Sequence, residues 1–345
     1  MDLDDLAALR ELDSQGMLAQ ITALPRRLEE SYDLGPALPL PECGGVERIL
    51  VAGEGVCAAG VDLLAGWAGD GLPVQLQAVP RLPLWGRGRR TLAVAVSAGG
   101  ESEPALELLA QACSEGCPAL ALTAGGRLAA LAGEKGVPVW PLRSGQAASI
   151  RSAEVFALLH CLLHRGGWAP DPQPEVVSAT HAMRNAQMNL LLEVPAVRNP
   201  AKRLAGQMVG RWVALFAAGF LAPVARRWKA QLNRMARTWA QVELLPEAAS
   251  QSLAGLENPG KPLEALMALF LRAPGLGAGS LSELDAARMA AMQQGINTDF
   301  ADARGETRFA QMWTSLLFAD YTAFYLAAAY GLDPAPAHVS HSTIS

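Results

Sequence analysis

The chain has 345 residues, of which 51% are hydrophobic and 18% are charged, and it contains 33 glycines. Because a single hydrophobic core seldom grows past about 250 residues, this length predicts about two α/β domains. The composition excludes a disordered, collagen-like or disulfide-stapled chain. The formal net charge of −5 supplies no overall attraction for nucleic acid or an anionic membrane, so neither is expected as a partner.

The cysteines and the N-terminus indicate where the protein works. Five cysteines, odd in number and irregularly spaced, indicate a reducing compartment and predict a cytoplasmic protein. The N-terminus, MDLDDLAALRELD, is acidic and amphipathic, unlike a targeting peptide. The longest apolar run, Trp212 to Ala225, is broken by Gly219 and Pro223 and is shorter than a bilayer crossing, so no membrane span is expected.

The first half of the chain has the rhythm of parallel βαβ units. Apolar side chains at helical spacing predict a helical lead-in over 1–35. Five short β-type runs then alternate with helix-length segments, which predicts a first lobe over 36–168. These runs are Arg48–Ala52, Val74–Val79, Thr91–Ser97, Ala119–Thr123 and Val137–Leu142. A long helix over Ser149–His164 and the proline-rich segment GGWAPDPQPEV close this lobe.

The segment 169–345 predicts a second, more helix-rich lobe with the same α/β layout. Strands are expected at Trp212–Phe216 and Trp239–Leu244, followed by a further apolar segment at Leu263–Leu271. The expected helices are Val176–Leu192, Val224–Arg237, Ser282–Gln294 and a long final helix over Glu306–Tyr330, with a loose tail after Pro334. The lead-in and the final helix carry more apolar surface than one lobe covers, which predicts a homodimer.

Three clusters of glycine or hydroxyl residues fall at strand-to-helix turns, where α/β sheets bind ligands. The first lacks the spacing of a dinucleotide fingerprint and is either a tight turn or a ligand contact. The second opens a helix and suits a phosphate, although its last serine could serve only as a helix N-cap. The arginine of the third either reaches an anion or lies in solvent. The clusters are Gly53, Gly55 and Cys57; Ser97, Gly100 and Ser102; and Thr123, Gly125, Gly126 and Arg127.

In this order, and with NPAKRLAG at 199–206 and VELLPEA at 242–248, the motifs resemble those of the bifunctional phosphoglucose/phosphomannose isomerases. These are two-lobed proteins built from sugar isomerase (SIS) domains. The resemblance implies two SIS lobes, each a parallel β-sheet flanked by helices in an α-β-α sandwich, with helical N- and C-terminal extensions. It also implies a homodimer and a sugar-phosphate site between lobes and across the subunit interface, where glucose 6-phosphate or mannose 6-phosphate is interconverted with fructose 6-phosphate.

The binding residues depart from the family pattern. Ser97 and Ser102 match hydroxyl positions of the family's phosphate turn, but Glu101 places a carboxylate where phosphate charge would be repelled. Cys57 stands at a family serine, and Arg151 lies one helical turn from the position of an expected arginine.

The catalytic positions depart further. Isomerisation through an enediol needs a carboxylate base and, in this family, a histidine that helps to open the sugar ring. The base position is Arg234 and the histidine position is Ser250, and neither side chain can do that work, because arginine stays protonated and serine has no suitable pKa. Glu243 and Glu247 are the fallback bases.

Three functions therefore stay open. They are a module that binds a sugar phosphate or a related anionic metabolite without isomerising it, an active sugar-phosphate isomerase, and a ligand-free dimeric scaffold. No cofactor or metal is expected, since His160 and His164 share a helix face without a third ligand. The basic segment Arg226 to Arg237 is either a solvated helix face or a contact for an anion or RNA.

Overall fold

The chain folds into two compact units. The computed structural model describes residues 2–258 and 260–335, so the tail expected to be loose lies outside the described residues from 336 onward. Leu24–Val177 forms one unit, called here the middle unit. Residues up to Ala23 join the chain from Ser178 onward in the other, called here the terminal unit.

The middle unit is built on a five-stranded parallel sheet with the order β2-β1-β3-β4-β5. The strands are β1 (Arg48–Gly53), β2 (Gln75–Ala78), β3 (Thr91–Ser97), β4 (Ala119–Thr123) and β5 (Val139–Pro141). Every residue of β3 and β4 is buried, which explains why these strands are apolar throughout instead of alternating.

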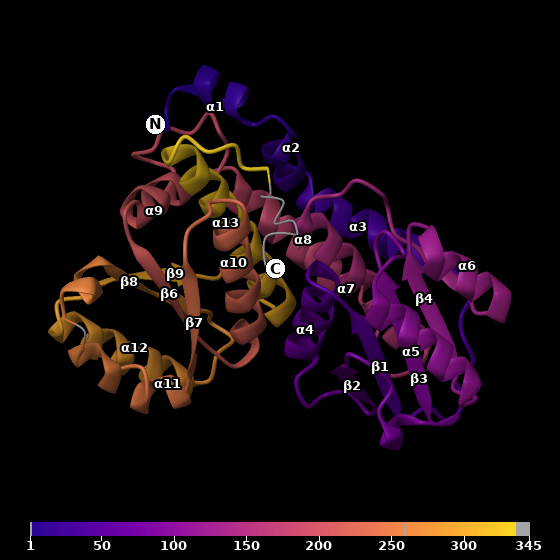
Figure 1. The fold of residues 1–345 in the computed structure, drawn as a ribbon. Coiled ribbons are helices and arrows are strands. Elements are labelled where there is room, and N and C mark those ends of the chain that lie inside the picture. Colours follow the sequence, from indigo (N-terminus) through magenta and orange to yellow (C-terminus); the bar gives the residue numbers. More distant parts are fainter. Residues whose placement is uncertain (1, 259, 336–345) are drawn as a thin grey trace, which may run out of the picture. The chain divides into compact units, whose positions relative to one another are not determined.

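Helices cover both faces of this sheet (Figure 1). Leu50 and Ala52 of β1 pack with Leu109 and Leu128 from α5 and α6 in one core, while α4 packs on α7, which in turn packs on α3. Between α3 and β1 lies the short 3-10 turn η1 (Gly35–Ala37). The helices are α3 (Leu24–Leu34), α4 (Val56–Ala68), α5 (Glu103–Ser114), α6 (Gly126–Lys135) and α7 (Ala148–Arg165).

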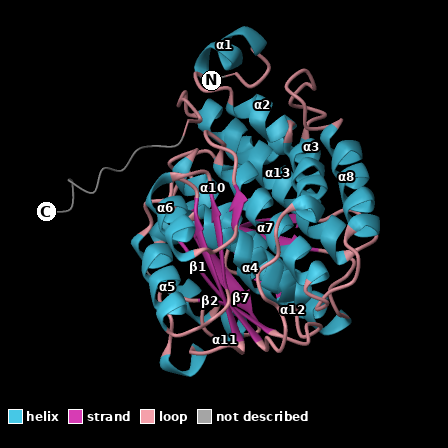
Figure 2. Ribbon diagram, turned by 90° about the vertical axis from the view of Figure 1, so that its right-hand side faces the viewer, coloured by secondary structure: helices cyan, strands magenta, loops and turns pink. Residues whose placement is uncertain are grey.

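The terminal unit holds a four-stranded parallel sheet with the order β7-β6-β8-β9. The strands are β6 (Trp212–Ala218), β7 (Ala240–Leu245), β8 (Leu266–Arg272) and β9 (Asn297–Asp302). The helices, drawn outside the strands in Figure 2, are α1 (Leu6–Leu12), α2 (Met17–Thr22), α9 (Pro200–Met208), α10 (Ala222–Arg234), α11 (Glu247–Ser250), α12 (Ala278–Gln293) and α13 (Arg308–Ala329). The boundary between the units falls within α8 (Gln173–Gln187).

The apolar side chains of α13 are covered inside the terminal unit. Trp313 and Phe324 are each 1% exposed and Tyr321 is 0% exposed, because α13 packs against α9, α10 and α2. This face of α13 therefore supplies no free apolar surface for a subunit contact, so the homodimer stays a prediction from the family resemblance. No helix in the described part of the chain is long and apolar enough to cross a bilayer.

The expected α/β architecture with two parallel sheets is confirmed. The helical lead-in is divided into three separate helices, α1, α2 and α3. Gly16 separates α1 from α2, and its φ of 62° lies in the left-handed region that favours glycine. The segment 2–23 packs in the terminal unit and α3 packs in the middle unit. Helix α9 and strand β9 were not expected from the sequence.

Candidate functional site

Three turns meet at one edge of the middle unit's sheet. Strands β1, β3 and β4 are neighbours and parallel, so their carboxyl ends lie at the same edge. The register places Gly53 beside Val96, and Ser97 beside Thr123. The glycine and hydroxyl clusters predicted from the sequence therefore follow adjacent strands, in the position where open α/β sheets bind ligands.

The second and third turns pack backbone against backbone. Ala124 N–H donates to Ala98 O at 3.1 Å, and Leu128 N–H donates to Gly100 O at 2.9 Å. Gly100 and Gly126 have φ of 81° and 71°. A Cβ on Gly100 would lie 2.0 Å from Gly125 O, so glycine is required here by the close approach as well as by the backbone angle.

The two serines of the second turn have different surroundings. Ser97 is 6% exposed, and its Oγ accepts a hydrogen bond from Ser102 N–H at 3.1 Å. Ser102 occupies the N-cap position of α5, but its side chain makes no capping bond. Its Oγ is buried and has no hydrogen-bond partner among the described residues. A buried hydroxyl without a partner costs free energy, which a ligand oxygen within reach would recover.

The third turn is already occupied by groups of the protein. Thr123 Oγ1 donates to Gly125 O at 2.8 Å and accepts from Gly125 N–H at 3.2 Å. The carboxylate of Glu101 accepts from Arg127 N–H at 3.1 Å, at the start of α6. The Arg127 side chain is exposed and turned to Glu103, with Nη1 and Oε1 2.6 Å apart, so a contact with a ligand anion stays a prediction.

The first turn is the least polar of the three. Gly55, with φ 54°, precedes α4, and a Cβ on Gly53 would lie 3.1 Å from Val96 O. Cys57 is 4% exposed, and burial raises the pKa of its thiol, with Ala98 and Arg151 opposing that shift. A protonated, buried thiol is a poor ligand for an anion.

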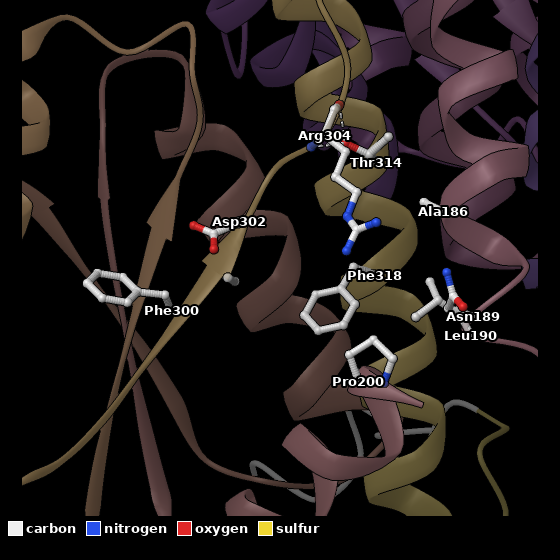
Figure 3. A pocket seen from close by; sticks show the side chains of 10 residues that line it. Ala186, Asn189, Leu190, Pro200, Phe300, Asp302, Arg304, Thr314 and Phe318 are labelled. Atoms are coloured by element: carbon white, nitrogen blue, oxygen red, sulfur yellow. Dashed lines mark hydrogen bonds between the residues drawn. The ribbon is translucent and has the colours of Figure 1, made fainter. Parts of the chain in front are cut away.

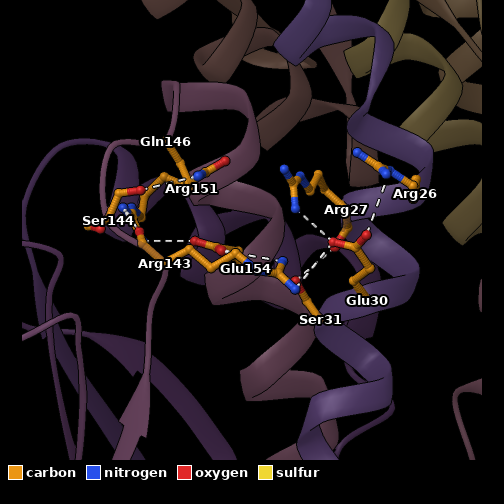
Figure 4. A network of polar contacts seen from close by, with 9 residues as sticks. All are labelled: Arg26, Arg27, Glu30, Ser31, Arg143, Ser144, Gln146, Arg151 and Glu154. Carbon is orange, nitrogen blue, oxygen red and sulfur yellow. Dashed lines mark hydrogen bonds and ion pairs between the residues drawn. The ribbon is translucent and has the colours of Figure 1, made fainter.

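Arg151, expected to serve as a substitute cation, lies in a network of ion pairs (Figure 4). Its Nη1 is 2.8 Å from Glu154 Oε2, and its Nη2 donates to Arg143 O. Arg143 in turn contacts Glu154 at 3.7 Å and Glu30 at 3.2 Å. Burial raises the pKa of Glu154, and Arg151 and Arg143 oppose that rise. Arg151 is 4% exposed, so it is held by its partners, whereas Arg143, whose side chain is 35% exposed, is open to solvent.

Arg27 and Arg26 extend this network on α3, where both contact Glu30, at 2.9 Å and 3.6 Å. The network thus joins four guanidinium groups to two carboxylates. Arg143 was not predicted as a site residue. It follows the short strand β5, and this place just after a strand end is the feature of the sequence that indicates it.

The positions implied for catalysis lie in the terminal unit. Arg234 is exposed at the end of α10, and Ser250 is exposed and donates its hydroxyl to Glu247 O at 3.1 Å. Glu247 is exposed in the first turn of α11. Glu243 accepts from Gln241 Nε2 at 2.7 Å on one oxygen and from the Ser252 hydroxyl on the other. Each Glu243 oxygen thus accepts one hydrogen bond from the protein, whereas the Glu247 carboxylate is exposed to solvent.

The basic segment Arg226 to Arg237 is not uniformly solvated. Arg227 is 5% exposed and contacts Asp320, which is fully buried, while Arg234 and Arg237 are exposed. Of the two histidines that share a face of α7, His160 is buried against Tyr32 and Trp67, whereas His164 is exposed. Among the described residues, no group of three or more His, Cys, Asp or Glu side chains could hold a metal ion.

Comparisons with known proteins indicate which proteins the chain is related to. Residues 197–341 match the family described as the bacterial phospho-glucose isomerase C-terminal SIS domain. A bifunctional phosphoglucose/phosphomannose isomerase from Caldicellulosiruptor bescii is 23% identical over 326 residues, which are 93% of this chain and 95% of that protein. The chain is a divergent relative of these isomerases. One from Aquifex aeolicus is also 23% identical, over 72% of this chain and 73% of its own length.

The fold agrees with this relationship. A glucose-6-phosphate isomerase like protein from Thermus thermophilus superposes with a TM-score of 0.64 at 20% identity, covering 98% of this chain and 99% of its own. The two parallel sheets are therefore SIS-type lobes, and the resemblance seen in the sequence is confirmed. The likeness at this identity concerns the fold, so the chemistry has to be argued from the residues of this chain.

Proposed function

We propose that the protein binds a sugar phosphate, or a related anionic metabolite, at the turns after β3 and β4 and does not isomerise it. The observation that carries the binding is the Ser102 hydroxyl, which is buried at the start of α5 without a partner among the described residues. A helix start favours an anion through its free amides and its dipole, and a phosphate oxygen would satisfy this hydroxyl.

The residues at the positions implied for catalysis support a loss of isomerisation. Arg234 cannot accept a proton from a sugar carbon, and Ser250 cannot replace an imidazole in opening the ring. The fallback base Glu243 has both oxygens hydrogen-bonded, and Glu247 is exposed. Neither glutamate is thus a carboxylate that is both unbonded and shielded from water, which supports a protein that does not isomerise its ligand.

The decisive experiment combines binding and turnover on the same preparation. A thermal-shift screen of glucose 6-phosphate, mannose 6-phosphate, fructose 6-phosphate and inorganic phosphate is expected to raise the melting temperature with at least one phosphosugar. A coupled isomerase assay is expected to stay at the background level. Turnover that co-purifies with the protein and disappears in Glu247→Gln would instead establish an active isomerase, and no shift with any phosphosugar would favour a ligand-free scaffold.

Two further features belong to this proposal. All five cysteines are free of disulfides, which supports a reducing compartment and hence a cytoplasmic location.

A homodimer is implied by the relatives' family, and light scattering at micromolar concentration tests it. A monomeric mass would remove the homodimer and any site shared between subunits.

A further inference from the structure

A cavity lies in the terminal unit, at the carboxyl end of strand β9. It has a volume of about 190 Å³. Its walls come from the ends of α8 and β9, the start of α9 and the inner face of α13 (Figure 3). Leu190 and Thr314 on its floor are each 3% exposed, while Asn189 and Arg304 at its rim are exposed. The Thr314 hydroxyl is already bonded to the backbone of Arg304, so the buried Leu190 offers apolar surface and the exposed Asn189 and Arg304 offer polar groups, the usual character of a small-molecule site.

Arg304 brings a positive charge into this cavity. Figure 3 shows its guanidinium directed between Phe318 and Asn189. Its backbone is fixed, because Thr314 Oγ1 accepts from Arg304 N–H at 2.9 Å and donates to Arg304 O at 2.8 Å. No hydrogen bond or ion pair engages the guanidinium among the residues that the structure describes. A guanidinium whose backbone is fixed, and which has no counter-ion among the described residues, can bind a carboxylate or phosphate with two parallel hydrogen bonds.

The neighbouring acid does not neutralise Arg304, because it is already paired. Asp302 accepts from Arg272 Nε at 2.8 Å and from Arg272 Nη2 at 3.1 Å. The Asp302–Arg272 ion pair therefore adds little net charge at the cavity, and the guanidinium of Arg304 is the charge that a ligand meets. One carboxylate matches that single positive charge, so a ligand with one negative charge is expected.

We infer that this cavity binds a small monocarboxylic acid with an apolar body, the carboxylate on Arg304 and the body against Phe318, Pro200 and Leu190. Asn189 stands beside the guanidinium and offers an amide to the same carboxylate or to a polar substituent (Figure 3). Dry cavities of about 150 Å³ accept benzene, so 190 Å³ has room for a six-membered ring and a carboxylate. This site is separate from the phosphosugar turns, because all of its lining residues lie in the terminal unit.

The test uses benzoate as the probe, with benzamide as its uncharged counterpart and inorganic phosphate as the competing anion. Ligand-observed NMR and calorimetry on the full chain are expected to give benzoate a Kd of about 1 mM or tighter. Arg304→Gln should weaken benzoate binding at least about tenfold. The control Arg203→Gln, which removes the same charge from an exposed site on α9 outside the lining, should change the Kd less than about twofold.

A second variant tests the apolar part. Ala186→Leu adds a helix-compatible side chain to the cavity wall and should abolish benzoate binding while the phosphosugar thermal shift persists. Benzoate that fails to bind the native protein overturns the inference, as does benzamide binding equally well. Phosphate binding more tightly than benzoate through Arg304 would overturn the choice of a carboxylate. None of these outcomes alters the phosphosugar result, because that site is probed with separate ligands and with variants in the middle unit.

Discussion

The carboxylate of Glu101 accepts a hydrogen bond from the backbone N–H of Arg127, with Oε1 and N 3.1 Å apart. These two residues come from turns after adjacent strands, and the bond places a carboxylate at the start of α6. A Cβ on Gly126 would lie 2.6 Å from the same oxygen, so the carboxylate fills the space over this turn. An internal anion thus occupies one of the two helix starts at which a phosphate is proposed to bind.

Removing this charge should tighten phosphosugar binding. In Glu101→Gln the amide oxygen can still accept from Arg127 N–H, but the repulsion between carboxylate and phosphate is gone. We expect affinity for the best phosphosugar to rise about tenfold by calorimetry. The free protein should lose about 0.3–1 kcal/mol of its free energy of unfolding, because a negative charge leaves a helix N-terminus.

The matched control is Glu134→Gln, which removes the same charge near the opposite end of α6. It should leave phosphosugar affinity within about twofold of the native value. Weaker binding in Glu101→Gln would show that the carboxylate supports the ligand instead of competing with it.

The two serines of the second turn should separate binding from folding. Ser102→Ala is expected to weaken phosphosugar binding by about 1.5–3 kcal/mol, or one to two decades in Kd, while the free energy of unfolding stays equal or rises. The reason is that its buried hydroxyl has no partner in the free protein, among the residues that the structure describes. Ser97→Ala should instead lower stability by about 1–3 kcal/mol, because it leaves Ser102 N–H without its acceptor.

Chemical denaturation and calorimetry on both variants check this contrast. If Ser102→Ala binds as tightly as the native protein while Cys57→Ala does not bind, the phosphate lies at the first turn and the placement at α5 is wrong.

The strands that position the site were predictable because they are buried on both faces. β3 and β4 have the bounds expected from the sequence, since each is a continuous apolar run ended by a residue of a hydroxyl cluster. Strand β9 was not predicted because it is a half-exposed edge strand with the sequence NTDFAD, which mixes polar and apolar residues. Helix α9 was not predicted because it is short and begins at Pro200, a residue that usually indicates the end of a regular element.

The sequence predicts where the candidate site lies, but not which of its groups are already hydrogen-bonded to other groups of the protein. The sequence places three turns at one sheet edge, but it does not say which amide is already bonded. The bond from Glu101 to Arg127 joins residues 26 apart, and it exists only because the turns after β3 and β4 approach closely. Likewise, the pairing of Arg127 with Glu103, and the open guanidinium of Arg304, depend on side-chain directions that motif spacing does not contain.

Breaking the buried ion pair between Arg227 on α10 and Asp320 on α13 should destabilise the protein. Replacing both partners with apolar residues should change the free energy of unfolding much less. Arg227 Nη2 lies 3.1 Å from Asp320 Oδ2, and Gln231 Nε2 donates to Asp320 Oδ1 at 2.9 Å. Asp320→Leu leaves the buried Arg227 unpaired and should cost about 3–5 kcal/mol of unfolding free energy. Arg227→Met combined with Asp320→Leu should recover most of that loss, as measured by urea denaturation.

The control for this pair is Arg226→Met, which removes a charge from an exposed neighbour on α10 and should cost less than about 1 kcal/mol. A double variant no more stable than Asp320→Leu alone would show that the pair also fixes the packing of α10 on α13.

The buried His160 should make folding sensitive to mildly acidic pH. Burial lowers the pKa of its imidazole to about 3, with His164 adding a smaller repulsion, and its Nδ1 lies 2.7 Å from the Tyr32 hydroxyl. The unfolded chain has a histidine pKa of about 6.5, so between pH 3 and pH 6.5 the unfolded state binds one more proton than the native state. Stability is therefore fully present above pH 6.5 and declines as the pH falls below it.

From pH 7 to pH 5, this difference corresponds to about 2 kcal/mol of unfolding free energy. Urea denaturation of the native protein and of His160→Gln at both pH values measures it, since the variant lacks the titrating group and should lose about 2 kcal/mol less over the same interval. His164→Gln, an exposed histidine on the same helix, should show the native pH difference. Equal losses in the native protein and in His160→Gln would mean that His160 takes up a proton in the folded state as readily as in the unfolded chain, contrary to its packing against Tyr32 and Trp67.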